Sequence, residues 1–240
     1  MPSADHRLLV ALDVERLEEA TALLDRLRGV VAGCKIGSQL FTAAGPAAIE
    51  AAHKRGVRVF LDLKFHDIPN TVAGAVREAT RLGVFMLNVH ASGGMAMMRA
   101  GAEAATQAAR EFGVGRPLVL GVTVLTSLDR RTLQAETGVA ASVEAHVLRL
   151  AERAHEAGLD GCVASAREIA LLRRALPRRF TLVTPGIRPA GAGEDDQVRI
   201  ATPTAALAAG ADYLVVGRPI TAAADPARAA TAILGEISRA

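Results

Sequence analysis

Charged side chains stand at the end of one apolar segment, where hydrophobic residues are expected. In the stretch VRVFLDLKF, residues 57–65, Asp62 and Lys64 interrupt the apolar run, and Asp67 follows just beyond it. Alternate side chains of a β-strand share a face, so we expect Asp62 and Lys64 to point the same way, with the apolar residues between them on the other face. Buried charges must pair, shift their pKa or take part in chemistry, because an isolated buried charge is costly.

Other apolar segments also end in polar residues. These residues include Asp13, Lys35, Asn88, His90, Thr126 and Arg218. Each has an ordinary structural explanation when taken alone: an Asp can cap a helix, a His can be a core residue, and an Asn can tie down backbone. The sequence Lys35, Asp62, Lys64 and Asp67 alternates in sign, so these groups can neutralise one another while Lys64 stays protonated. Together they favour a catalytic network over a structural ion-pair cluster.

The elements that position these residues alternate between short apolar segments and longer Ala-rich segments of helical period. The expected strands are 8–14, 31–37, 57–65, 85–91, 118–125, 161–165, 180–187 and 213–217, with helices such as 15–27, 71–82, 142–156 and 166–176 between them. Eight strand–helix units predict the α/β class and a (β/α)8 TIM barrel in a single domain, residues 1–240. An open doubly wound sheet fits less well, because no G-x-G-x-x-G follows the first expected strand. Catalytic groups of a barrel lie at the C-terminal ends of its strands, where these polar residues occur.

The end of the chain carries a candidate phosphate site. Gly217 and Arg218 follow the last expected strand, and a short helix is expected to begin near Asp225. Loops after strands seven and eight of a barrel commonly bind phosphate through backbone N–H groups, and an Arg side chain adds a fork of donors.

Two longer connections are candidate lids over such a site. The segment 184–197 is rich in Gly and Ala, has no apolar periodicity, and carries Arg188 and Gln197 near its ends. The connection 126–141 is long for a barrel and is expected to form an opposite lid.

Composition excludes several classes of function. The 240 residues carry a net charge of +3, no Trp and only 3% aromatic residues, so a nucleic-acid surface with stacking platforms is not expected. No apolar run is long enough to span a bilayer, and the N-terminus has no signal-peptide core, which predicts a cytoplasmic protein. Cys34 and Cys162 fall in expected strand cores, so we expect reduced packing residues. No metal is expected at Asp62 and Asp67, because lysines stand beside them.

The segment 62–71, DLKFHDIPNT, resembles the signature of the orotidine 5′-phosphate decarboxylase family. The resemblance covers nearly the whole chain and includes, in order, residues 11–13, 35–37, 88–94, 122–127, 183–188, 196–197 and 217–219. It implies a cofactor-free homodimer, with active sites at the interface, that converts orotidine 5′-monophosphate (OMP) to uridine 5′-monophosphate (UMP) in pyrimidine biosynthesis.

The resemblance also implies roles for individual residues. Lys64 would donate a proton to C6 of the pyrimidine, Asp62 would lie against the substrate carboxylate, and Lys35 would complete the network with Asp67 from the partner subunit. The remaining implied substrate contacts are Asp13 and Lys35 with Thr71 of the partner at the ribose, Thr126 and Ser127 at the pyrimidine edge, and Arg188, Gln197, Gly217 and Arg218 at the 5′-phosphate.

Two other functions stay open at this point. A Mg²⁺-dependent sugar-phosphate decarboxylase or aldolase of the same suprafamily would share the Asp-x-Lys-x-x-Asp pattern, but it places a metal-binding acid where this chain has Lys35. A non-catalytic sensor of a phosphorylated ligand would need the phosphate site but not four charges around one strand end.

Overall fold

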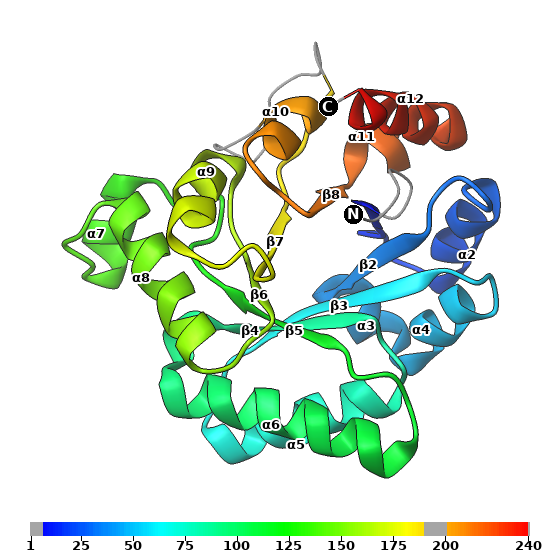
Figure 1. Ribbon diagram of the computed structural model, residues 1–240. Coiled ribbons are helices and arrows are strands. Elements are labelled where there is room, and N and C mark those ends of the chain that lie inside the picture. The colour runs from blue at the N-terminus through cyan, green and yellow to red at the C-terminus, as the bar shows by residue number, and fades with distance from the viewer. Residues whose placement is uncertain (1–6, 190–200, 240) are drawn as a thin grey trace.

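Eight parallel strands follow one another around a closed barrel, in the order in which they occur along the chain (Figure 1). This computed structural model describes residues 7–189 and 201–239. The strands are β1 Leu8–Ala11, β2 Gly33–Gly37, β3 Arg58–Phe65, β4 Met86–His90, β5 Leu118–Val122, β6 Gly161–Val163, β7 Thr181–Thr184 and β8 Tyr213–Val216. Because β8 pairs with β1, the sheet has no free edge. The predicted (β/α)8 barrel is confirmed.

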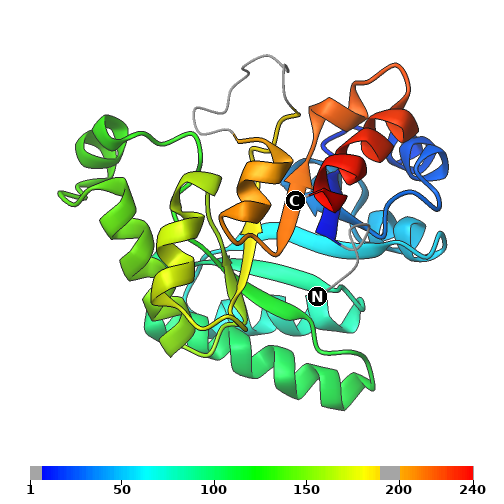
Figure 2. The same cartoon turned by 45° about the horizontal axis from the view of Figure 1, so that its top comes forward.

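Helices surround the barrel on its outer side (Figures 1 and 2). They are α2 Leu17–Arg26, α3 Ser38–Ala44, α4 Pro46–His53, α5 Pro69–Arg81, α6 Met95–Phe112, α7 Arg130–Thr137, α8 Val143–Glu156, α9 Ala166–Ala175, α10 Pro203–Ala208, α11 Arg218–Thr221 and α12 Pro226–Ser238, with a 3₁₀ turn at Ala91–Gly93. None of the helices in the described ranges is both long enough and apolar enough to cross a membrane.

The structure corrects several expected boundaries at the C-terminal mouth of the barrel. β1, β5 and β7 end at Ala11, Val122 and Thr184, three residues before the expected ends, because the chain leaves the sheet there to form the rim. The expected short helix near Asp225 is instead α12, with 13 residues, and the short helix α11 starts at Arg218. The connection 126–141 contains the helix α7, and its expected role as an opposite lid stays a prediction.

Side-chain alternation along the strands produces two apolar layers. A small cluster fills the inside of the barrel; it comprises Leu9, Ala11, Phe60, Met86, Leu120, Val183 and Val215. A larger cluster packs between the strands and the helices and includes Leu61, with Leu63 and Phe65 against it. Since Phe60 faces inward, Asp62 two residues later faces the barrel mouth. The same alternation of side chains therefore places apolar residues inside the barrel and a charged residue at its C-terminal mouth.

Arg–Asp pairs join adjacent strands at the opposite, N-terminal end. Asp212, just before β8, accepts hydrogen bonds from the backbone N–H of Leu182 at 2.8 Å and from Arg173 Nη2 at 2.6 Å. Asp160, just before β6, pairs in the same way with Arg116 at 2.8 Å. These contacts hold the barrel together far from its mouth.

Candidate active site

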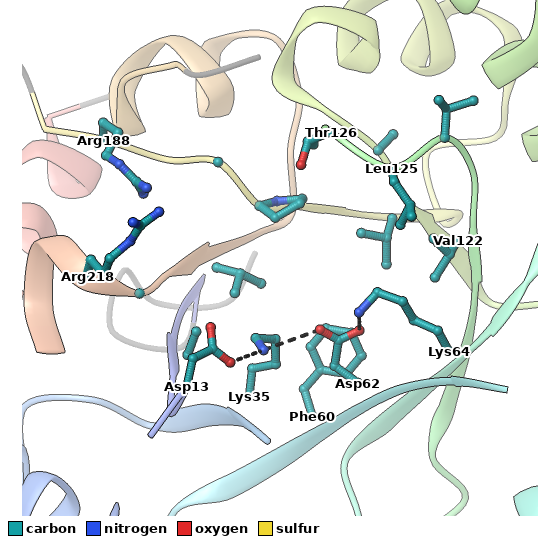
Figure 3. A pocket seen from close by; sticks show the side chains of 18 of the residues that line it. Asp13, Lys35, Phe60, Asp62, Lys64, Val122, Leu125, Thr126, Arg188 and Arg218 are labelled. Atoms are coloured by element: carbon teal, nitrogen blue, oxygen red, sulfur yellow. Dashed lines mark hydrogen bonds and ion pairs between the residues drawn. The ribbon is translucent and has the colours of Figure 1, made fainter. Parts of the chain in front are cut away.

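A cavity of about 470 Å³ opens at the C-terminal mouth of the barrel, a size typical of small-molecule sites. Its charged lining residues are Asp13, Lys35, Asp62, Lys64, Arg188 and Arg218 (Figure 3). Four of them lie along the floor, while the two arginines extend from the opposite side. The structure therefore brings together residues separated by about two hundred positions in the chain.

The floor is a row of four charges that alternate in sign. Lys35 Nζ donates to Asp13 Oδ1 at 2.8 Å and lies 3.4 Å from Asp62 Oδ2, and Lys64 Nζ donates to Asp62 Oδ1 at 2.7 Å (Figure 3). Lys35 and Asp62 are buried, with only 8% and 9% of their surface exposed. Burial alone would lower the pKa of the Lys35 ammonium, but the carboxylates of Asp62 and Asp13 outweigh it and raise that pKa. Lys35 therefore stays charged between two carboxylates.

Lys64 lies at an irregular point of β3. Its φ is +53°, which makes it the only non-glycine residue at positive φ in the described part of the chain. The pairing of β3 with β4 shifts here, since Leu61 pairs with Leu87 and Phe65 with Val89. The side chains of Asp62 and Lys64 do meet, as expected, but a bulge in β3 brings them together and not the alternation of a regular strand.

Two arginines form the other side of the cavity. Arg188 and Arg218 point toward each other, Arg188 from the segment after β7 and Arg218 from the first residue of α11, after β8 (Figure 3). Arg188 is buried, and its Nη1 donates to the carbonyl of Ile187 at 3.1 Å. Gly186 and Gly217 line the cavity beside them. Two facing guanidinium groups next to glycine backbone are suited to one anionic group such as a phosphate.

Apolar side chains line the space between the floor and the arginines. They include Phe60, Val122, Leu125, Val163 and Val215, with Thr126 at the rim. Most of these apolar residues were not singled out from sequence. A signal was available for most of them, because Val122, Val163 and Val215 lie at or next to the last position of their strands. The cavity thus has an apolar middle, a charged floor and a cationic end, which suits a flat, partly apolar ligand that carries an anion.

Three of the described residues expected in the site do not line this cavity. Asp67, on the connection from β3 into α5, and Thr71, in the first turn of α5, are both exposed. Asp67 Oδ1 accepts a hydrogen bond from the backbone N–H of the next residue at 2.6 Å. Ser127 is also exposed, beside Thr126. Gln197, with most of the expected lid at 184–197, lies outside the described residues. A single chain therefore does not bring Asp67 to Lys64.

Neither cysteine forms a disulfide, and both thiols are buried. Burial raises the pKa of Cys34 and that of Cys162 to about 12. Among the described residues, no group of three or more His, Cys, Asp or Glu side chains is arranged to hold a metal ion.

Comparisons with known proteins agree with the resemblance seen in the sequence. Residues 6–233 match the model of the orotidine 5′-phosphate decarboxylase / HUMPS family. The chain is 55% identical over 234 residues to the orotidine 5′-phosphate decarboxylase of Moorella thermoacetica, which covers 98% of this chain and 93% of that protein. The Vibrio cholerae enzyme of the same name is 52% identical over 222 residues, covering 92% and 94% of the two chains. The crystal structure of orotidine 5′-phosphate decarboxylase from Lactobacillus acidophilus superposes with a TM-score of 0.85 at 35% identity, covering 97% of this chain and 99% of that one.

Proposed function

This chain belongs to the orotidine 5′-phosphate decarboxylase / HUMPS family, and we propose that the charged floor of its cavity carries out the decarboxylation of OMP to UMP. The reaction is that of a carboxy-lyase in pyrimidine biosynthesis. The observation that carries the proposal is the alternating row Asp13–Lys35–Asp62–Lys64, which lies across the cavity from two arginines. That arrangement offers a proton donor at one end of the ligand and an anion site at the other.

Lys64 is the proposed proton donor. The bond between C6 and the carboxylate carbon breaks, CO₂ leaves, and the electron pair stays on C6 until the Lys64 ammonium delivers a proton to it. The ring has no carbonyl placed next to C6 as a simple electron sink, so the positive charge of Lys64 must stabilise the carbanion as it forms. One charge pair about 4 Å apart contributes about 4 kcal/mol at an effective dielectric near 20. Further stabilisation must come from the rest of the bound nucleotide.

Asp62 and Lys35 keep Lys64 ready for this step. Asp62 orients the ammonium through its 2.7 Å hydrogen bond and would lie beside the substrate carboxylate. Lys35 lies on the other side of the Asp62 carboxylate, with its Nζ 3.4 Å from Oδ2, and pairs with it there. In the proposed homodimer, Asp67 of one subunit completes the row in its partner, and its exposed position on its own chain supports this assignment. The exposed Ile68 next to it, at 66% exposure, supports an interface at the same place.

The remaining contacts hold the nucleotide. Arg188 and Arg218 would bind the 5′-phosphate, together with the Gly217 backbone and with Gln197 from the lid. Asp13 and Lys35, with Thr71 of the second subunit, would hold the ribose hydroxyls, and Thr126 and Ser127 would contact the pyrimidine edge. Binding energy from the phosphate and ribose is then available to close the site and exclude water around the reacting carbon. A cytoplasmic location belongs to the same proposal and is supported by the two buried free thiols.

The decisive test is Lys64→Ala. We expect turnover, followed as the loss of orotate absorbance without added metal, to be abolished, while UMP still binds in calorimetry. The matched control is Lys54→Ala, which removes a lysine whose side chain is 76% exposed, and we expect native turnover from it. A near-native kcat in Lys64→Ala would falsify the assignment of the proton donor.

Two further experiments address the alternatives and the dimer. Activity should survive EDTA, whereas a loss that Mg²⁺ restores would favour the metal-dependent sugar-phosphate enzyme. Mixing Lys64→Ala with Asp67→Ala subunits should restore one intact site in each heterodimer. If exchanged subunits show no recovered activity, Asp67 does not act across the interface.

A further inference from the structure

We propose that Asn88 is a positioning residue, whose side-chain amide holds both Lys64 and Asp62 in their reactive arrangement. Asn88 lies on β4, is fully buried, and is not part of the cavity lining, so it acts through its neighbours and not on the substrate. The inference rests on the proposed role of Lys64 and adds a residue to that same site.

The first observation is the shape of the backbone around Asn88. Between the pairs Leu61↔Leu87 and Phe65↔Val89, β3 has three residues where β4 has only Asn88. Those extra residues end in Lys64, whose φ of +53° is unfavourable for a side chain with a Cβ. Such a conformation persists only when its surroundings hold it in place.

The second observation is the set of bonds that Asn88 makes. Its Oδ1 accepts the backbone N–H of Lys64 at 2.8 Å, and its Nδ2 donates to Asp62 Oδ1 at 2.7 Å. The same carboxylate oxygen accepts from Lys64 Nζ at 2.7 Å. The three residues therefore form a closed ring of hydrogen bonds, from the Lys64 backbone through Asn88 and Asp62 back to the Lys64 ammonium.

This closed set of hydrogen bonds requires an amide side chain at position 88. The N–H of Lys64 needs an acceptor and the carboxylate of Asp62 needs a donor, so one short side chain must offer both. Alanine offers neither, and an ionised aspartate offers only acceptors. Asn88 thus fixes the position of the Lys64 backbone, and through Asp62 it also fixes the direction of the ammonium.

Asn88→Ala and Asn88→Asp test this role, with Thr123→Val as the matched control. Thr123, just after β5, is a buried residue that does not line the cavity, and its hydroxyl donates a 2.8 Å hydrogen bond to the Val163 carbonyl. We expect Asn88→Ala to lower kcat at least about tenfold, because small misplacements of a reacting group are costly. UMP affinity should stay within about twofold, and Thr123→Val should keep its native kcat.

The isosteric Asn88→Asp supplies a second signature, even if Asn88→Ala does not fold. Lys35, Lys64 and His90 are the other titratable groups near Asp62. In this variant the new carboxylate at position 88 lies next to that of Asp62, and the two share a proton as the pH falls. The shared proton provides a hydrogen-bond donor between them, as the amide of Asn88 does, and returns the site to its native net charge. The kcat of Asn88→Asp relative to the native enzyme should therefore rise as the pH is lowered. The same ratio for Asn88→Ala should stay flat.

Several results would overturn this role. They are a native kcat in Asn88→Ala, an effect confined to KM, an equal loss of kcat in Thr123→Val, and a pH-independent ratio for Asn88→Asp. The Lys64→Ala variant separates this failure from that of the proposed function. If Lys64→Ala is inactive while Asn88→Ala is native, only the role of Asn88 is wrong.

Discussion

A methyl group at Gly37 should disturb the charged floor without removing any charge from it. Gly37 ends β2, and a Cβ built there would lie 2.9 Å from Lys35 Nζ and 3.3 Å from Asp13 Oδ1. Its φ of −93° and ψ of −177° are open to any residue, so Gly37→Ala adds no backbone strain. The substitution therefore acts through contact with the Lys35 ammonium.

The size of the effect follows from the distances. Non-bonded heavy atoms pack at about 3.5 Å, so Nζ must retreat and lengthen its 2.8 Å bond to Asp13 to about 3.4 Å. At an effective dielectric near 20, this loses about 1 kcal/mol of attraction, and the half-exposed Asp13 reduces the loss through solvent screening. Weakening a hydrogen bond between charged groups adds about 1 kcal/mol. A total of about 1–2 kcal/mol corresponds to a fall in kcat/KM of roughly 5- to 30-fold.

The assay is kcat/KM from the loss of orotate absorbance, measured beside the thermal midpoint. Gly235→Ala is the control, because Gly235 lies inside α12 and a Cβ there meets no atom within 4 Å. We expect it to keep native kcat/KM and to stabilise the fold by about 1 kcal/mol through helix propensity. A folded Gly37→Ala enzyme with native kcat/KM would show that the position of the Lys35 ammonium does not matter to the reaction.

Other substitutions and probes test separate parts of the molecule. Arg218→Ala should weaken UMP binding roughly 10- to 100-fold by calorimetry, because it removes a charged hydrogen-bond donor from the proposed phosphate site. Arg188→Ala should have the same effect. An equal loss of affinity for uridine, which has no phosphate, would contradict this role. Burial raises the pKa of Cys34 and Cys162 to about 12, so both thiols stay protonated at about pH 8. We expect them to be alkylated far more slowly in the native protein than in the denatured chain, as followed by mass spectrometry. Rapid alkylation of the native protein would refute this. Asp212→Ala should cost about 1–3 kcal/mol of stability in thermal unfolding while kcat stays native, since it lies at the far end of the barrel; a lost kcat in the folded variant would show coupling to the mouth.

Sequence patterns predicted the barrel and much of its charged mouth because both follow from side-chain alternation. Once Phe60 faces inward, Asp62 must face the mouth, and the end of every strand meets the same rim. The helix α7 was missed, although Asp129 accepts from the backbone N–H of Thr132 at 2.8 Å. Asp is a preferred N-cap residue, so Asp129 could have been recognised in the sequence as a possible start of a helix.

The bulge at Lys64 and the part played by Asn88 were not predictable in the same way. Alternation describes a regular strand, and it gives no sign that three residues of β3 face one of β4. The bond from Asn88 to Asp62 depends on that cross-strand register, which is a property of two strands and not of either alone. The exposed Asp67 is a different case, because the proposal for its role requires a second subunit.

The side chains on the cavity floor differ in solvent exposure, and this difference bears on where the proton used in each turnover comes from. The Lys64 side chain is 34% exposed, against 11% for Lys35 and 12% for Asp62. In the proposed mechanism, Lys64 is left neutral after it gives its proton to C6 and must be protonated again before the next cycle. Its exposed side gives bulk water access for this step. One solvent proton is then consumed for every CO₂ released. In heavy water, each UMP formed should carry a deuterium at C6.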